Sequence, residues 1–185
     1  MKAVATVGRH VDVQVFPEFR RELPVRWLRQ VAKTALSHGL DATATGTNNG
    51  AMRSSMSLVI ADDETVQGLN RDYRGLDETT DVLAFSSQHS GQYEGDGAPP
   101  ELESHDPFIT PEDDGFVGEV VVSHPQCVRQ AEAQGRSPRD ELALLIVHGV
   151  LHLLGYDHLE PGEEREMQAL EKTCLADVGI QGMRP

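Results

Sequence analysis

The sequence predicts a single α+β domain, in which about four strands form a mixed sheet that packs with four to five helices. Two observations support this prediction. The chain has 185 residues, of which 38% are hydrophobic, a size and composition typical of one soluble domain with one core. Segments with the two-residue period of a strand alternate along the chain with segments that have the period of a helix, and no stretch repeats another. Periodicity alone is also compatible with an α/β domain, and it does not give the order of the strands.

The first half of the chain is predicted to form two strands, each followed by a helix. Residues 10–16 (HVDVQVF) alternate apolar and polar side chains, as a half-buried strand does. Residues 24–40 carry apolar side chains at helical spacing, and we expect the glycine near the end of this segment to stop the helix. Residues 56–61 (MSLVIA) are typical of a short apolar strand. Residues 62–75 begin with acidic side chains, which favour a helix start because they compensate the positive end of the helix dipole.

The second half is predicted to form two strands and then three helices. Residues 81–87 (DVLAFSS) and 115–123 (GFVGEVVVS) have the apolar character of strands. Residues 123–135 form a helix that begins at a serine cap, and residues 137–155 begin with the S-P-x-D pattern of a helix start. Residues 163–179 make the last helix.

An acidic segment separates the two strands of the second half. Residues 88–115 are rich in Gly, Pro and Ser, contain no Lys or Arg and show no periodicity, so we expect a flexible insertion in a domain that spans residues 1–185. An acidic partner-binding loop is the functional alternative. Eight of the fourteen excess negative charges of the chain lie in this segment: Glu94, Asp96, Glu101, Glu103, Asp106, Glu112, Asp113 and Asp114.

Charge and hydropathy exclude several classes of protein. A net charge of −14 argues against a protein that coats nucleic acid non-specifically, because that mode of binding needs a broad basic surface. No run approaches the roughly 18 apolar residues of a membrane span, and the N-terminus lacks the apolar stretch of a secretory signal. We therefore expect a cytoplasmic protein with no membrane partner. Cys127 and Cys174 lie far apart and outside any CxxC pattern, so neither a disulfide framework nor a cysteine zinc site is expected.

The segment HGVLHLLGYDH at 148–158 predicts a metal site. His148 and His152 are four residues apart on a predicted helix, so their imidazoles project from the same face, one turn apart. Gly155 falls where the helix must end, and the chain that turns back there can bring His158 to the same ion. Three neutral imidazoles suit one zinc ion and leave a fourth position for water, the open arrangement of a catalytic site.

The alternatives for this segment differ in strength. The histidines could be ordinary polar positions of an amphipathic helix, but this helix is otherwise strongly apolar, so histidines without a partner would cost desolvation energy. Asp157 could accept the free N–H of a ligand, or it could be a turn residue. The spacing HxxxHxxGxxH is also that of the metzincin proteases, which carry a glutamate general base directly after the first histidine. That position is Gly149 here, which disfavours peptide hydrolysis.

Three segments together resemble the YbeY family of bacterial metal-dependent endoribonucleases, also described as rRNA maturation factors. HGVLHLLGYDH at 148–158 is similar to the metal motif of that family nearly residue for residue. LNRDYRGLDETTDVLAF at 69–85 resembles its second signature, and VGEVVVS at 117–123 its third. The three motifs occur in the order of the family, and the resemblance covers roughly residues 55–178.

The resemblance implies a function and a set of site residues. His148, His152 and His158 would be the ligands of one zinc ion, and Arg74 the catalytic arginine that faces the metal. An arginine suits this role because its planar, permanently charged guanidinium can bind a phosphate with two hydrogen bonds. The implied activity is endonucleolytic cleavage of single-stranded RNA, with water or the RNA 2′-OH as nucleophile. The implied role is maturation of ribosomal RNA at the 3′ end of the small-subunit rRNA, and ribosome quality control, with the ribosome or its small subunit as partner.

Two alternatives from other classes remain open: a metzincin-like metalloprotease, and a non-catalytic ribosome-associated protein in which zinc has a structural role. The chain also departs from the family pattern, because Leu76 and Thr79 stand where the family usually has Lys and Pro. One phosphate-contacting cation is therefore missing.

A row of cations is a candidate for contacts with the RNA backbone. Arg26, Arg29 and Lys33 recur at helical spacing on the first predicted helix, and Arg20 and Arg21 precede them. The row lacks an interleaved set of aromatic side chains on which bases could stack, so a solvated helix face is the alternative.

Overall fold

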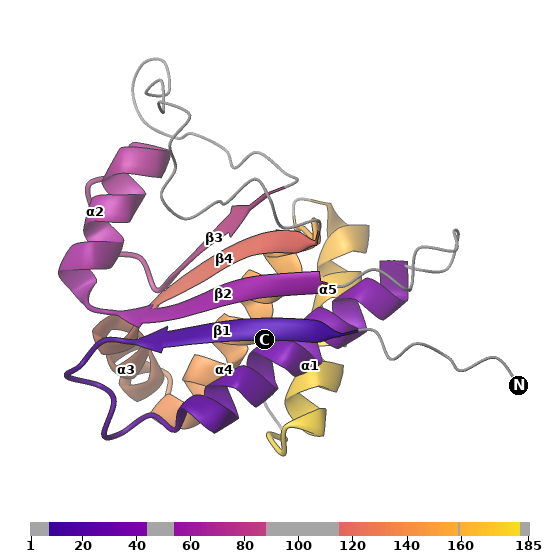
Figure 1. The fold of residues 1–185 in the computed structure, drawn as a ribbon, viewed down its shortest axis with the longest axis horizontal. Helices are drawn as coiled ribbons and strands as arrows, with labels where there is room; N and C mark the ends of the chain where they lie inside the picture. Colours follow the sequence, from indigo (N-terminus) through magenta and orange to yellow (C-terminus); the bar gives the residue numbers. More distant parts are fainter. Residues whose placement is uncertain (1–7, 44–53, 88–114, 159, 182–185) are drawn as a thin grey trace, which may run out of the picture.

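The computed structural model describes residues 8–43, 54–87, 115–158 and 160–181, and their arrangement confirms the predicted α+β class. Four strands form one mixed sheet in the order β1-β2-β4-β3, in which β1, β2 and β4 run parallel and β3 pairs antiparallel with β4. Figure 1 shows the sheet with its labelled elements. Their bounds are β1 (Arg9–Val15), α1 (Val25–Thr43), β2 (Ser54–Ala61), α2 (Asp63–Arg74), β3 (Val82–Ser86), β4 (Phe116–Ser123), α3 (His124–Ala133), α4 (Pro138–Leu153) and α5 (Pro161–Asp177).

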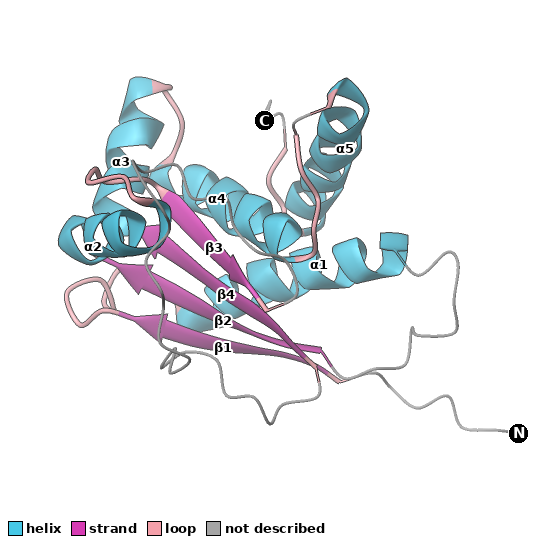
Figure 2. Ribbon diagram, turned by 90° about the horizontal axis from the view of Figure 1, so that it is seen from above, coloured by secondary structure: helices cyan, strands magenta, loops and turns pink. Residues whose placement is uncertain are grey.

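The main core lies between one face of the sheet and the helices α1, α4 and α5, which Figure 2 shows together on that side. Leu58 and Ile60 of β2 face this core, as do Val120 and Val122 of β4. Helix α4 lies at its centre, since ten of its sixteen residues are buried. Such a helix has little surface left for solvent, so a polar side chain on it needs a partner.

A smaller core on the opposite face of the sheet holds helix α2. Val59 and Ala61 alternate with the residues of the main core along β2, so their side chains point to this second face. Val66 and Leu69 of α2 pack there. At the far end of α2, the ring of Tyr73 meets the ring of Phe85 on β3 edge to face, with 5.0 Å between centroids.

The predicted helix starts agree with the structure. The side chains of Asp62, Ser123 and Ser137 each accept a hydrogen bond from the backbone N–H three residues later, and so cap α2, α3 and α4. Both cysteines are buried free thiols. Apart from Gly115, the predicted acidic insertion at 88–115 lies outside the described residues.

The prediction that a glycine stops the first helix was wrong. Helix α1 continues through Gly39 to Thr43. A Cβ at Gly39 would lie 2.4 Å from Cδ1 of Leu154, so this glycine lets α1 approach the end of α4 closely. The Tyr156 hydroxyl also donates a 3.0 Å hydrogen bond to the carbonyl of Gly39. The pattern alone did not distinguish a glycine that ends a helix from one that permits close packing.

Among the helices in the described part of the chain, none combines the length and the hydropathy that crossing a bilayer requires.

Candidate metal centre

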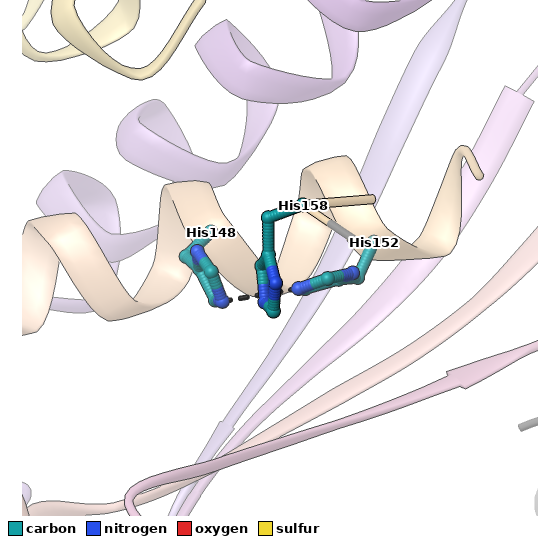
Figure 3. A group of neighbouring side chains, drawn as sticks. All are labelled: His148, His152 and His158. Atoms are coloured by element: carbon teal, nitrogen blue, oxygen red, sulfur yellow. Dashed lines mark hydrogen bonds between the residues drawn. The ribbon is translucent and has the colours of Figure 1, made fainter. Parts of the chain in front are cut away.

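Three histidines converge at the C-terminal end of α4. His148 and His152 project from α4, and His158 comes from the connection that leads to α5 (Figure 3). One ligand nitrogen from each of the three lies within 4.8 Å of the others. The two Nε2 atoms of His148 and His152 are 3.0 Å apart. The convergence of these side chains, predicted from their spacing, is therefore present in the structure.

A turn after α4 brings the third histidine back. Gly155 has a φ of 85°, a left-handed conformation that favours glycine, and its N–H donates to the carbonyl of His152. Asp157 then accepts a 2.7 Å hydrogen bond from the backbone N–H of His158. Of the two roles considered for Asp157, this contact is that of a turn residue.

The partner of the first histidine comes from α5 and was missed by the sequence analysis. Oε1 of Glu171 lies 2.8 Å from Nδ1 of His148, and Glu171 is 3% exposed. The signal was present in the sequence, because Glu171 occupies a position on the apolar stripe of its helix. The other buried residues of that stripe are Met167, Cys174 and Leu175.

Burial keeps the second histidine neutral. Desolvation, together with the neighbouring His148 and His158, lowers the pKa of His152 from 6.5 to about 4. At neutral pH its imidazole therefore has a free electron pair, which a metal ligand needs.

The donor set fits a zinc ion. Two imidazole nitrogens at about 2.0–2.1 Å from one ion stand about 3.3 Å apart at the tetrahedral angle. The Nε2 atoms of His148 and His152, at 3.0 Å, are close to this separation. His158 has an exposed side chain on a turn, so a small movement would bring its nitrogen to the same ion. A cluster of three imidazoles with no carboxylate or thiolate among the ligand atoms suits zinc better than Mg²⁺ or Ca²⁺, which prefer oxygen ligands.

Arg74, the predicted catalytic arginine, is the last residue of α2 and is half-buried. Strand β3 contacts the C-terminal ends of both α2 and α4. Its Phe85 packs against Tyr73, the residue before Arg74, and the hydroxyl of its Ser86 donates a 3.0 Å hydrogen bond to the carbonyl of Leu153 in α4. Arg74 and two of the histidines, His148 and His152, thus lie on helices that contact neighbouring residues of β3. The role of Arg74 opposite a metal ion stays a prediction.

The cationic row of the first helix lies elsewhere. Arg26, Arg29 and Lys33 are exposed on α1 and line a shallow cavity of about 460 Å³. The rest of the cavity lining comes from α1 and from Asp177 of α5, and none of the three clustered histidines lines it.

Comparison with known proteins agrees with the fold and the motifs. A family model described as "Endoribonuclease YbeY" matches residues 19–179, which include Arg74 and all three histidines. Proteins named Endoribonuclease YbeY are similar to this chain: that of Paramagnetospirillum magneticum is 44% identical over 125 residues, covering 68% of each chain. That of Dehalococcoides mccartyi strain 195 is 39% identical over 173 residues, covering 92% of this chain and 91% of the relative.

A solved structure shares the fold. The solution structure of a protein from Thermotoga maritima is 20% identical and covers 91% of this chain and 88% of its own, with a TM-score of 0.50.

Proposed function

This chain belongs to the YbeY family of endoribonucleases, and from that membership and its histidine cluster we propose that it is a zinc-dependent endoribonuclease. The observation that carries the proposal is the convergence of three histidine ligand atoms within 4.8 Å in a chain whose relatives are named as endoribonucleases. The proposed substrate is single-stranded RNA, and the whole chain is proposed to act as one domain, residues 1–185.

His148, His152 and His158 are the proposed ligands of one zinc ion. When bound there, zinc supplies Lewis acidity, which polarises a phosphate oxygen or a water molecule. The neutral state of His152 and the turn that presents His158 prepare the protein side of this site.

Arg74 is the proposed catalytic residue of the protein itself. Its guanidinium offers several N–H donors in a fixed plane and can hold the scissile phosphate with two hydrogen bonds. Negative charge on the phosphate grows as the nucleophile attacks, so a fixed positive charge stabilises the transition state more than the ground state.

The proposed biological role follows from family membership. We place the protein in the cytoplasm, where it would act in maturation of the 3′ end of small-subunit ribosomal RNA and in ribosome quality control, with the ribosome or its small subunit as partner.

Single-turnover cleavage of an end-labelled single-stranded RNA tests the proposal. Four preparations are compared: metal-replete protein, protein stripped by chelator and then supplied with zinc, Arg74→Ala and His152→Ala. We expect cleavage by the first two, with strong losses in both variants. Equal cleavage by all four would indicate a contaminating ribonuclease and would contradict the assignment.

The ends of the RNA products identify the nucleophile. A 2′,3′-cyclic phosphate would mean that the 2′-OH attacks first, whereas a linear phosphate formed without a cyclic intermediate would mean that water attacks. Cleavage of peptides that is sensitive to chelator and survives Arg74→Ala would instead support a metzincin-like protease. Loss of the fold in His152→Ala, with no RNA turnover under any condition, would support a structural zinc.

A further inference from the structure

We propose that Glu171 is a positioning residue of the metal centre: it fixes the tautomer of His148 and so makes helix α5 part of the site. This inference rests on the metal ligands assigned under the proposed function. Nothing in the metal motif itself points to Glu171, which lies on another helix beyond the end of that motif.

The geometry assigns different tasks to the two nitrogens of His148. Nδ1 lies 2.8 Å from Oε1 of Glu171, while Nε2 lies 3.0 Å from Nε2 of His152, on the side where the three ligands meet. An ionised carboxylate can accept hydrogen bonds but cannot donate them, so Nδ1 must carry the proton. In the neutral ring Nε2 then has the free electron pair, and it is the nitrogen that faces the cluster.

The burial of Glu171 supports a specific role for this contact. Its side chain is 4% exposed and lies on the apolar stripe that α5 presses against the core. A carboxylate in such a position loses much of its hydration, and this loss is tolerated when a hydrogen-bond donor compensates it. His148 supplies that donor. The buried carboxylate of Glu171 and the Nδ1–H of the imidazole therefore each have a hydrogen-bond partner.

The order of the elements gives the contact a further consequence. His148 and His152 lie on α4, His158 follows in the connection, and Glu171 lies on α5. The connection that carries His158 therefore joins two helices that each contribute to the site, α4 with two ligands and α5 with Glu171. Binding of the ion should stabilise the docking of α5, and loss of Glu171 should weaken binding of the ion.

Two measurements test the proposal without using RNA. The first is the nitrogen chemical shifts of the His148 ring in wild-type metal-free protein at mildly alkaline pH, where we expect the tautomer with the proton on Nδ1. The second is the affinity for Zn²⁺, measured by competition with a chromophoric chelator. We expect Glu171→Ala to weaken zinc binding by about 10- to 100-fold. Glu171→Gln keeps an oxygen acceptor, so we expect it to recover part of the loss.

Glu141→Gln is the matched control. Glu141 is 1% exposed and accepts a 3.0 Å hydrogen bond from Arg136, so it is a buried carboxylate of α4 that pairs with an arginine rather than with a histidine. We expect the Glu141→Gln variant to bind zinc as tightly as the wild type. The proposal is overturned if Glu171→Ala binds zinc within about twofold of the wild type, or if Glu141→Gln loses as much affinity. It is also overturned if His148 carries its proton on Nε2, a result that needs no variant to fold.

The outcomes separate this inference from the proposed function. Zinc binding that depends on Glu171 would stand even if the protein cleaved no RNA. Zinc-dependent RNA cleavage by Glu171→Ala with unchanged zinc affinity would overturn the positioning role and leave the ribonuclease assignment intact.

Discussion

Gly149 lies so close to Val120 of β4 that a Cβ on the glycine would be 2.8 Å from Cγ1 of the valine. The same atom would be 3.1 Å from Cγ2 of Val82 on β3. Position 149 therefore faces the sheet, although it follows a histidine that faces the metal cluster. A larger side chain at this position, such as the glutamate of the metzincin motif, would enter space that valine side chains of the sheet already fill. The packing of α4 on the sheet thus disfavours a general base directly after the first histidine.

The packing at Gly149 predicts a loss of stability on substitution. Gly149→Ala should lower the free energy of unfolding by about 1–3 kcal/mol, because the added methyl group enters space that valine side chains of the sheet already fill. Urea denaturation measures this change. Gly162→Ala is the control, since a Cβ there meets nothing within 4 Å and should cost little or no stability. A Gly149→Ala protein as stable as the wild type would contradict the close contact.

Removing one histidine should prevent stable metal binding and slow cleavage strongly. We expect His152→Ala to retain no stoichiometric zinc after dialysis and to cleave RNA on the order of 10³-fold more slowly, because the bound ion contributes several kcal/mol. Elemental analysis and single-turnover rates measure the two effects. His38→Ala is the matched control: His38 lies on α1, pairs with Asp177 and is not one of the three clustered histidines. A zinc content in His152→Ala equal to that of the control would refute the ligand assignment.

Arg74 should affect the chemical step and leave the metal in place. Arg74→Ala is expected to reduce the single-turnover rate by about 10²- to 10³-fold, the typical effect of removing one transition-state donor, with unchanged zinc content. Arg74→Lys should recover part of the rate, since it keeps the charge but loses the planar pair of donors. Arg71→Ala, on the same helix, removes an exposed arginine that pairs with Asp72 and should have little effect. Equal single-turnover rates for Arg74→Ala and Arg71→Ala would contradict the catalytic role of Arg74.

Stability should decrease in mild acid, in part through His124. This side chain at the start of α3 lies beside the ring of Phe19, and burial holds its pKa below 6.5, opposed by Glu22. As the pH drops, His124 therefore takes up a proton in the unfolded chain before it does in the folded chain. Its contribution to stability is fully present above pH 6.5 and decreases as the pH falls below that value. One such group contributes at most about 1.4 kcal/mol per pH unit.

Urea denaturation from neutral pH down to about pH 5.5 tests the contribution of His124. The His124→Gln variant cannot take up that proton, so its stability should fall less steeply than that of the wild type. If the free energy of unfolding falls equally steeply with pH in the two proteins, burial of His124 does not contribute to the loss of stability in acid.

The parts of the structure that depend on local sequence were predictable. Helix starts at Ser123 and Ser137 follow from serine side chains that can accept a backbone N–H, and the spacing of His148 and His152 determines that they share a helix face. The strand order was not predictable, because the pairing of β2 with β4 depends on contacts between segments far apart in the sequence. The same limit applies to Gly39 and Glu171. Each owes its role to a residue distant in the chain, Leu154 and His148 respectively.

The pairing of the strands also affects how the chain folds. Ser55 of β2 pairs with Phe116 of β4, and the whole of α2 and β3 lies between them, so a long loop must close before the centre of the sheet can form. Non-local pairing of this kind slows folding, and we expect a folding time on the order of milliseconds or longer. The histidines and Glu171 come from one contiguous stretch, residues 148–171, so only a short loop must close to bring them together. Zinc present during synthesis or refolding could therefore bind to this helical pair early and speed the steps that follow.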